Sequence, residues 1–516
     1  MTKMTENPIE INPSDIDNLP AALKTCLNSA QENGEPLHET EQNILDALLE
    51  MGRQAMACHI ARMGNGDQGS TLEMADGTEL NRLPTEHTRQ YCSIFGRFTI
   101  SRVVYGTRAG QKIEFIPLDH QLQLPESVFS YLLQNWDQSF VQGEPYNKVA
   151  EIIKKIFHLS QSVNSLERSC LQMSEAAPEF MNTLSPPLAE KEAELFVLQA
   201  DHKGVAMRRE EQPGLPKSTK GKESDKRKGE KKMALVTAVY SVDPYIRTPK
   251  QMCSILMGER LPKDDFPSRP KPCFKRVRAI LQRNEAGTTH GQTKEGYQWL
   301  KGELVTRNPD GEKPTILLCD GQPSLWEAGE DYLPHKAFNI VEILDIMHVN
   351  GYLWEAVHLI HPKKSPQASA LYQKQLLRIL SGELPVVLRS LKYIASRNGL
   401  IKADRDKLEK IFNYFTANEN RMKYNEYLEK GYPIASGVIE GACRSVVKDR
   451  MEQSGMRWTM DGANAVLALR SVHASGLWDD FIPFYIQREQ QKRFPVLPAK
   501  IAAANDETVY HDRLLA

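Results

Sequence analysis

The stretch Thr315-Ile316-Leu317-Leu318-Cys319-Asp320-Gly321 decides how the rest of the chain is interpreted. Its unbroken apolar run is typical of a strand buried on both faces, in a sheet covered by helices. Functional side chains gather beyond the carboxyl ends of such strands, and this run ends at an aspartate. Gly321 permits a sharp exit, and a helical stretch follows near Leu325. Taken alone, the pattern favours a simpler role for Asp320, as the cap of that turn or helix.

Two other carboxylates occur in similar settings far away in the sequence. Upstream, Leu195-Phe196-Val197-Leu198-Gln199-Ala200-Asp201 also runs from apolar strand residues into an aspartate. Downstream, Glu440 lies in the first turn of a helix predicted from about Gly437. Two strand-end aspartates and a helical glutamate are what a two-metal phosphoryl-transfer site requires, because hard divalent cations prefer oxygen ligands held on separate rigid elements.

Length and composition predict a soluble protein of two to four domains. The chain has 516 residues, of which 41% are hydrophobic and 25% charged, as in ordinary globular proteins. No apolar run reaches membrane-spanning length, and the polar start lacks a signal-peptide core. The eight cysteines include no CxxC pair, which predicts a cytoplasmic, reducing location and argues against a zinc ribbon. The formal net charge of −1 restricts any polyanion site to a local patch.

Periodicity and turn residues divide the chain into an accessory region, an interrupted core and a tail. A β-hairpin is expected within 94–117. The lysine-rich interval from Lys217 to Lys232 is either a mobile loop or a flexible phosphate-binding arm. The predicted parts are a disordered tail (1–39), a helix and β-hairpin module (40–125), a helical region (126–180), the first part of the core (190–350), a helical insertion (351–432), the second part of the core (433–480) and a C-terminal tail (481–516).

Two helical stripes between 127 and 176 are joined by a brief turn. They form either a helix-turn-helix, which would place the second helix in a major groove, or an ordinary helical hairpin that touches no DNA. The pattern alone favours the hairpin. In the first case Asn164, Ser165 and Arg168 would face the DNA.

The first part of the core predicts a mixed α/β sheet. Its elements follow the order strand, strand, strand, helix, strand, helix, strand, which is typical of a ribonuclease-H-like sheet. Right-handed crossovers in the parallel part would bring the strand ends with Asp201 and Asp320 side by side. The five strands are expected at 195–201, 233–240, 252–257, 315–319 and 338–344.

Several further residues near the predicted strand ends and the Glu440 helix allow two interpretations each. Arg444 and Lys448 follow Glu440 at i+4 and i+8. Glu440 and Arg444 form either an ordinary helix pair, worth roughly 0.2–0.5 kcal/mol, or a face on which Glu440 binds metal while the basic residues meet DNA phosphates. Asp345 and His348, three apart after the last strand, are either a capping pair or auxiliary residues, as a fourth carboxylate and a general acid/base or phosphate contact.

Four motifs follow one another in the C-terminal third of the chain. They are Ser436-Gly437-Val438-Ile439-Glu440-Gly441-Ala442-Cys443, Lys448-Asp449-Arg450-Met451, Ser454-Gly455-Met456-Arg457-Trp458 and Gly462-Ala463-Asn464-Ala465-Val466-Leu467-Ala468-Leu469-Arg470. Together they strongly resemble the ISKra family of insertion-sequence transposases. The run from Leu344 to Val349, with Leu353-Trp354-Glu355-Ala356 after it, matches that family's segment beyond its second aspartate and is similar to the Asp-x-x-His signature of Mutator-like transposases. The likeness extends from about Phe95 to Asp480.

The resemblance implies a DDE transposase on a ribonuclease-H-like fold, with Asp201, Asp320 and Glu440 as the catalytic triad. The triad would hold two Mg²⁺ (or Mn²⁺) ions for an in-line displacement at a DNA phosphate. The implied partners are the element's terminal inverted repeats and target DNA, with at least a dimer on the DNA and no membrane. Two other functions stay open: a catalytically silent DNA-binding regulator, and a ribonuclease-H-like nuclease that cuts without joining.

Basic and aromatic residues after the Glu440 helix are expected at the DNA. Arg450 and Arg457 would contact phosphates together with Arg444 and Lys448. Trp458 would stack on an unpaired base, although a tryptophan in the protein core is an equally good interpretation.

Overall fold

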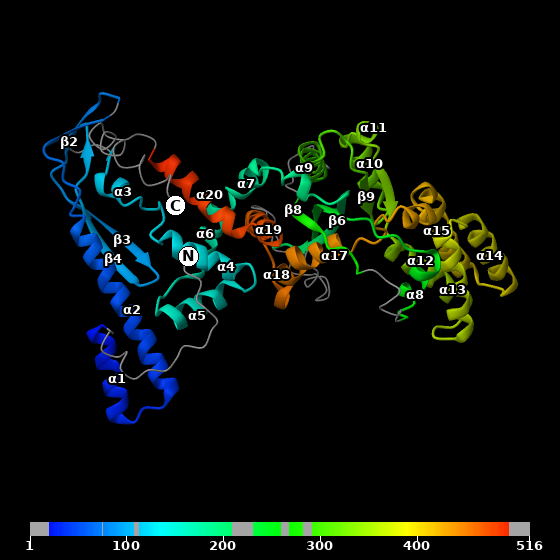
Figure 1. Ribbon diagram of the computed structural model, residues 1–516, viewed down its shortest axis with the longest axis horizontal. Helices are drawn as coiled ribbons and strands as arrows, with labels where there is room; N and C mark the ends of the chain where they lie inside the picture. Colours follow the sequence, from blue (N-terminus) through cyan, green and yellow to red (C-terminus); the bar gives the residue numbers. More distant parts are fainter. Residues whose placement is uncertain are drawn as a thin grey trace, which may run out of the picture. The chain divides into compact units, whose positions relative to one another are not determined.

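The computed structural model describes residues 20–74, 76–107, 113–208, 231–259, 268–281 and 291–494. The chain divides into two units, Met1–Ser169 with Phe484–Ala516 and Cys170–Pro483, and each is described by itself. Figure 1 labels their helices and strands. Most of the lysine-rich interval from Lys217 to Lys232 lies outside the described residues. Within the described ranges, none of the helices combines the length and the apolar composition needed to cross a membrane.

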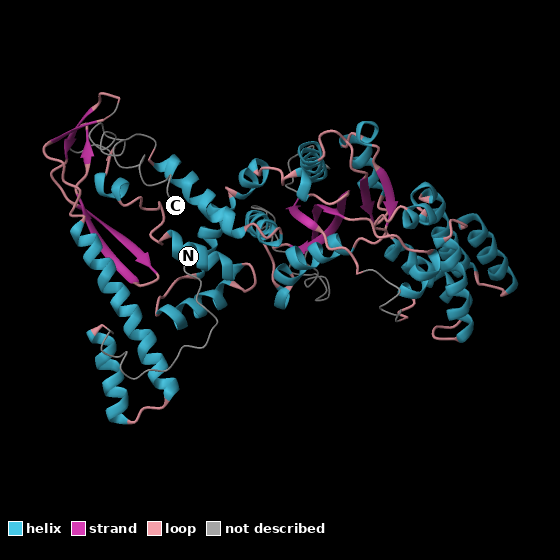
Figure 2. Cartoon of the chain, in the orientation of Figure 1, coloured by secondary structure: helices cyan, strands magenta, loops and turns pink. Residues whose placement is uncertain are grey.

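A five-stranded mixed sheet forms the core of the second unit (Figure 2). Its strands are β6 (Leu195–Ala206), β7 (Lys231–Val242), β8 (Cys273–Leu281), β9 (Thr315–Cys319) and β10 (Val341–Leu344). They lie in the order β8-β7-β6-β9-β10; β7 is antiparallel to β6 and β8, whereas β9 is parallel to β6 and β10. Every residue of β9 is buried, as predicted for a strand covered on both faces.

Five strands form the sheet as predicted, but the predicted element order is not fully observed, because a helix lies where the third strand was expected and the third strand comes from a later segment. Residues 252–257 lie at the end of α8 (Pro249–Leu256) and just after it, and a capping box between Thr248 and Gln251 starts this helix. β8 takes the third strand position instead. Its basic residues interrupt the buried apolar ones, so its composition hides the strand pattern. β10 also begins later than expected, because α11 (His335–Phe338) precedes it.

Helix α19 (Met460–Ala474) covers the edge of the sheet that β8 forms. Backbone N–H groups of β8 donate hydrogen bonds to its polar side chains, from Ala279 to Ser471 Oγ at 3.0 Å and from Leu281 to Asn464 Oδ1 at 3.1 Å. These bonds satisfy an edge strand that would otherwise offer unpaired groups to other chains.

Further helices pack on the faces of the sheet and carry part of the site. Gly296 lies so close to Leu235 of β7 that a Cβ atom would be 2.4 Å from the leucine side chain, and the helix bearing Gly296 therefore approaches the strand closely. These helical elements are α7 (Ala177–Thr183), α9 (Gly291–Arg307), α10 (Pro323–Tyr332), α17 (Gly437–Ala442), a π-helical turn (Cys443–Lys448) and α18 (Asp449–Met451).

The segment predicted as a helical insertion, 351–432, is helical and lies between β10 and α17 in the sequence (Figure 1). It leaves and re-enters the core at the end of β10. Tyr424 donates its hydroxyl to the carbonyl of Leu344 at 2.8 Å, and the N–H of Ile346 donates to the carbonyl of Ile434 at 2.9 Å. Its helices are α12 (Ile346–Ile360), α13 (Pro366–Leu380), α14 (Leu384–Arg397), α15 (Lys402–Ala417) and α16 (Tyr424–Glu429).

Both predicted tails contain helices. Within 1–39, α1 (Ala21–Asn33) ends at Gly34, which has the left-handed conformation. The N–H of Gly34 donates to carbonyls of the last helical turn. Within 481–516, α20 (Trp478–Arg493) continues as a helix. Capping and tertiary packing therefore stabilise segments that polar composition alone predicts to be loose. Residues 1–19 and 495–516 lie outside the described ranges.

The hairpin predicted within 94–117 is displaced towards the N-terminus. β3 (His87–Ser93) pairs with β4 (Gly96–Arg102), and β3 alternates exposed with half-buried residues, so it lacks the apolar run used to find strands. Of the predicted pairing, the described residues show only the bridge between Tyr105 and Phe115, and residues 108–112 lie outside the described ranges. The other elements of the first unit, two of which extend into the second, are α2 (Leu37–Arg62), β1 (Thr71–Glu73), β2 (Glu79–Arg82), β5 (Tyr105–Gly106), α3 (Pro117–Gln121), α4 (Tyr131–Val141), α5 (Tyr146–Phe157), α6 (Val163–Ser174) and α20.

Candidate active site

The register of β6 and β9 brings Asp201 and Asp320 to neighbouring positions. Ala200 is the partner of Cys319 in the parallel ladder, and each aspartate is the next residue of the chain. The prediction that Asp201 ends its strand is wrong, because β6 continues to Ala206 along β7. Asp201 lies where β6 loses its β9 neighbour, so the two aspartates still meet at one point of the sheet.

Asp201 is partly buried and accepts two hydrogen bonds. Its Oδ1 accepts the N–H of His202 at 2.6 Å, and its Oδ2 lies 3.3 Å from Cys443 Sγ, which donates its proton. Burial raises the pKa of Asp201, the bond from Cys443 opposes that rise, and the negative charge of Asp320 adds to it. Among the described residues neither aspartate forms an ion pair, so their repulsion is not balanced by a lysine or arginine.

Asp320 is held at a tight exit from β9. Its Oδ1 accepts the N–H of Gln322 at 2.9 Å, so the simpler capping role exists. Gly321 has φ +90°, which confirms the predicted sharp turn, and a Cβ atom there would be 2.5 Å from the hydroxyl of Tyr414. That hydroxyl donates to the carbonyl of Asp320 at 2.7 Å. A helix of the insertion, α15, therefore fixes the end of the strand.

Asp345 is fully buried, and its two carboxylate oxygens are engaged by four polar groups. Oδ1 accepts the N–H groups of Met347 at 3.0 Å and Ser436 at 3.2 Å. Oδ2 accepts the hydroxyl of Ser436 at 2.7 Å and lies 3.0 Å from His348 Nδ1. A carboxylate has about four acceptor positions, so Asp345 has none left for a metal ion. It caps α12 and links that helix to the residue before α17.

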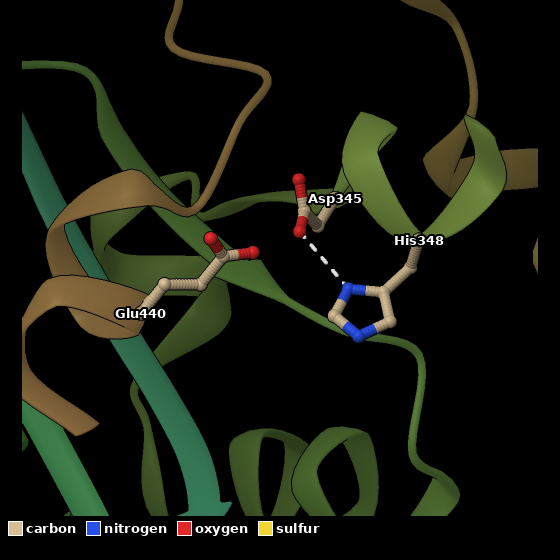
Figure 3. A group of neighbouring side chains, drawn as sticks. All are labelled: Asp345, His348 and Glu440. Atoms are coloured by element: carbon tan, nitrogen blue, oxygen red, sulfur yellow. Dashed lines mark hydrogen bonds and ion pairs between the residues drawn. The ribbon is translucent and has the colours of Figure 1, made fainter. Parts of the chain in front are cut away.

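His348 and Glu440 extend from α12 and α17 towards the same space (Figure 3). One ligand atom from each of Asp345, His348 and Glu440 lies within 4.8 Å of the others, and Ser436 Oγ lies 3.4 Å from Glu440 Oε1. The hydrogen bond to Asp345 raises the pKa of His348 despite partial burial, and the nearby carboxylates of Asp320 and Asp201 add to the rise. These charge effects connect the Asp345–His348 pair to the two strand aspartates.

The donor set fits a divalent cation. Asp201, Asp320 and Glu440 offer carboxylate oxygens, which hard cations prefer, and the imidazole nitrogen of His348 also suits Mn²⁺ or a later transition metal. Asp345 acts through its neighbours, because a buried carboxylate on a histidine fixes the tautomer and orientation of the ring.

Comparison with known proteins gives little independent guidance. No family model matches the chain, and no curated protein matches it. The chain is similar to a solved transposase. This structure is described as the Drosophila P element transposase strand transfer complex; the match has 13% sequence identity, covers 73% of this chain and 85% of that one, and has a TM-score of 0.23.

Two residues predicted to contact DNA are buried in the protein. Arg450 is 1% exposed and Trp458 is 8% exposed, and the guanidinium carbon lies 4.9 Å from the centre of the indole ring. Trp458 donates its ring N–H to the carbonyl of Met451 at 3.1 Å and its backbone N–H to the carbonyl of Ala206 at 3.0 Å. The DNA-contact prediction is wrong for both residues, and the core interpretation of Trp458 is confirmed. They connect α18 to the end of β6.

The other three residues of this unit that were predicted to contact DNA, Arg444, Lys448 and Arg457, are exposed. Arg444 does not form the ordinary helix pair with Glu440; its Nε lies 3.5 Å from a carboxylate oxygen of Asp449. The π-helical turn that begins at Cys443 changes the spacing on which the i+4 expectation depends. Contacts of these residues with DNA stay a prediction.

Arg168 belongs to the predicted pair of helices in the accessory region. α5 and α6 are the two helices; His158 ends α5 in the left-handed conformation, and Ser162 Oγ accepts the N–H of Ser165 at 3.1 Å before α6. Arg168 is exposed on α6. Two helices and a turn are thus confirmed, and a DNA-reading role stays a prediction.

Sequence reasoning did not single out three residues that organise this site, Gln199, Ser436 and Cys443. Gln199 Oε1 accepts the N–H of Ile439 at 2.9 Å, and the other two contact Asp345 and Asp201 as described. The sequence contains one signal for Gln199. It is a polar residue inside a buried strand, two positions before Asp201 and therefore on the same face of the strand. Ser436 and Cys443 belong to the motif around Glu440, but their partners come from distant segments.

Proposed function

We propose that the chain is a metal-dependent DNA transposase that cleaves element ends and joins them to target DNA. One observation carries the proposal. Asp201 and Asp320 lie at neighbouring positions of the sheet, and Glu440 and His348 extend from two helices towards one space. Both aspartates act on the pKa of His348, and among the described residues none of the three carboxylates forms an ion pair with a lysine or arginine. Such a cluster is suited to divalent cations and to a phosphate held by them.

The strand order supports a ribonuclease-H-like core. Three antiparallel strands, β6 to β8, stand beside two parallel ones, β9 and β10, in the order β8-β7-β6-β9-β10. This arrangement agrees with the fold that the motif resemblance implies. It also brings Asp201, where β6 loses its β9 neighbour, beside Asp320, which directly follows β9.

Asp201, Asp320 and Glu440 would hold two Mg²⁺ or Mn²⁺ ions. Bound ions of this kind supply Lewis acidity, which favours an oxygen nucleophile and stabilises a leaving oxygen in an in-line phosphoryl transfer. The protein's own contribution is to hold the carboxylates on rigid elements, two on neighbouring strands and one in the first turn of a helix.

His348 would contact the reacting phosphate or donate a proton to the leaving oxygen. Asp345 accepts from Nδ1 and thereby fixes the ring, with Nε2 at the end of the ring away from Asp345 (Figure 3). Since the same bond raises the pKa of His348, the ring keeps its proton to higher pH than a free histidine. The exposed residues Arg444, Lys448 and Arg457 would contact DNA phosphates.

The test is strand cleavage on the element's terminal inverted repeats with Mg²⁺ or Mn²⁺, comparing the wild type with Asp320→Asn. This substitution removes one carboxylate charge at nearly constant shape, and Asp310→Asn, at an exposed position, is the matched control. We expect metal-dependent nicking at the repeat boundary by the wild type and the control but not by Asp320→Asn. Equal cleavage by all three would exclude Asp320 from the site.

The products distinguish the transposase from its alternatives. Transposition requires joined DNA, so a reaction that cuts but never joins would favour a nuclease. Specific binding to the repeats without metal-dependent cleavage would favour a catalytically silent regulator. The assay therefore uses a labelled terminal fragment together with supercoiled target DNA, so that cleavage and joining are scored in one reaction.

A further inference from the structure

The helix that carries Glu440 is attached to β6 by two side-chain hydrogen bonds. The first comes from the strand. Gln199 is completely buried, and its Oε1 accepts the N–H of Ile439 in the first turn of α17 at 2.9 Å. The first N–H groups of a helix have no partner within the helix, so a side chain must satisfy them where water is excluded. Gln199 performs this role from a different element.

The second bond comes from the helix. Cys443 is 4% exposed, and its Sγ donates to Asp201 Oδ2 at 3.3 Å. Cys443 begins the π-helical turn that follows α17. Such insertions re-aim side chains relative to a regular helix and are frequent at functional sites.

The two bonds lie on either side of Glu440. Ile439 precedes Glu440 by one residue, and Cys443 follows it by three. On the strand, Gln199 and Asp201 are two residues apart and face the same side. The two bonds therefore join β6, which carries Asp201, to the helix that carries Glu440. Both bonds are made by residues close in sequence to these two carboxylates or by Asp201 itself.

We propose that Gln199 and Cys443 are positioning residues that set the separation of the Asp201 and Glu440 carboxylates and so the affinity of the site for divalent cations. This inference rests on the proposed function. Groups that orient metal ligands contribute to affinity without touching the ion, and their loss costs roughly 10–100-fold in metal affinity or activity. Neither residue belongs to the proposed triad.

The experiment measures Mn²⁺ binding directly, from the electron paramagnetic resonance signal of the free ion, in the full chain without DNA. The variants are Gln199→Leu, which removes the acceptor, and Cys443→Ala, which removes the donor. Their matched controls are Gln375→Leu and Cys253→Ala, at a buried glutamine of α13 and a buried cysteine of α8. Thermal unfolding of each variant is recorded alongside.

We expect the Mn²⁺ dissociation constant to rise about tenfold or more in Gln199→Leu and Cys443→Ala and to stay at the wild-type value in both controls. Cys443→Ser keeps a hydroxyl donor and should restore most of the Mn²⁺ affinity. If the two residues had a purely structural role, the loss of Mn²⁺ affinity in each variant would instead parallel the fall in its melting temperature. The Mn²⁺ concentration for half-maximal cleavage should rise in parallel.

Two results would overturn the inference, and they differ from each other. If Gln199→Leu and Cys443→Ala fold and bind Mn²⁺ as tightly as the wild type, the two residues do not position the ligands, while the proposed function stands. If the wild type itself neither binds Mn²⁺ nor cleaves the terminal DNA, the proposed function fails and the inference with it.

Discussion

Strand β6 passes two clusters of carboxylates with opposite surroundings, one buried and one partly exposed. Beside its start, Glu192 and Glu303 are paired with arginines. Arg307 Nε lies 2.6 Å from Glu192, and Arg276 Nη1 lies 2.9 Å from Glu303, with every one of these residues less than a tenth exposed. Ser241 adds a hydroxyl donor to Glu192. Each carboxylate in this cluster has its countercharge inside the protein.

Further along the strand, around Asp201, the carboxylates have no such partners. Asp201 lies beside Asp320, and the described residues contribute no lysine or arginine ion pair to either or to Glu440. Burial and like charge both raise the pKa of Asp201. Buried charges need partners, and the first cluster has them within the fold, whereas Asp201 and Asp320 are only partly buried and Glu440 is exposed. The difference distinguishes a structural cluster from the proposed site.

The largest expected effect tests the second cluster. Replacing Asp201 by Asn should lower metal-dependent cleavage by about 10³-fold or more, as removal of a residue that acts directly in a catalytic unit does. It should leave the melting temperature unchanged or slightly higher, since it removes repulsion with Asp320 and breaks no ion pair. Cleavage assays and thermal unfolding of the same preparation check this. If the substitution abolished folding as well as activity, Asp201 would be a structural residue like the carboxylates of the first cluster.

The first cluster should respond in the opposite sense. Replacing Arg307 by Met leaves Glu192 and Glu303 with fewer buried countercharges and should lower the free energy of unfolding by about 3–5 kcal/mol. Cleavage per folded molecule should persist. Denaturant unfolding measures the loss, and Lys407→Met, in an exposed pair with Asp404, provides a control expected to change stability by less than about 1 kcal/mol.

Asp345 shares features of both clusters, because it is buried and fully hydrogen-bonded yet orients residues of the site. Asp345→Asn should lower cleavage by roughly 10–100-fold and change its pH dependence. The pKa of His348 is raised by the carboxylate, so activity that needs the protonated ring is present at low pH and is lost as pH rises through that raised pKa. Without the carboxylate the loss should begin at lower pH. His348→Gln serves as the reference. If the pH profile of cleavage by Asp345→Asn were unchanged, the imidazole ring of His348 would take no part in the reaction.

The comparison also explains what the sequence could predict. Local patterns suffice for β6 and β9, whose apolar runs end near the aspartates, and for the helical insertion. They fail for β8, where arginines and lysines occupy a strand, and for the α8 segment, where a capping box overrides an apolar run. Tertiary contacts decide these cases.

The site itself was partly within reach of sequence reasoning. Glu440 lies off the apolar stripe predicted for its helix, and it is exposed as that pattern predicts. The burial of Arg450 against Trp458 could not be predicted, because a basic residue near an aromatic one reads equally well as a DNA contact. The bonds of Gln199 and Cys443 join residues about 240 positions apart, and no local pattern records such a pairing.

The smallest expected effect concerns the exposed basic residues near the site. Lys448→Ala should leave thermal stability within about 0.5 kcal/mol of the wild type, because Lys448 is exposed and is part of no described ion pair. If it contacts a phosphate, the substitution should weaken DNA binding about equally for all sequences and reduce the slope of log affinity against log salt by about 1. Binding titrations on a terminal repeat and on unrelated DNA, at several salt concentrations, measure this. An unchanged slope would show that the exposed end of the π-helical turn lies outside the DNA interface. The proposed catalytic role of Asp201 and Asp320 would stand, since cleavage by them depends on the metal ion and not on the salt dependence of DNA binding.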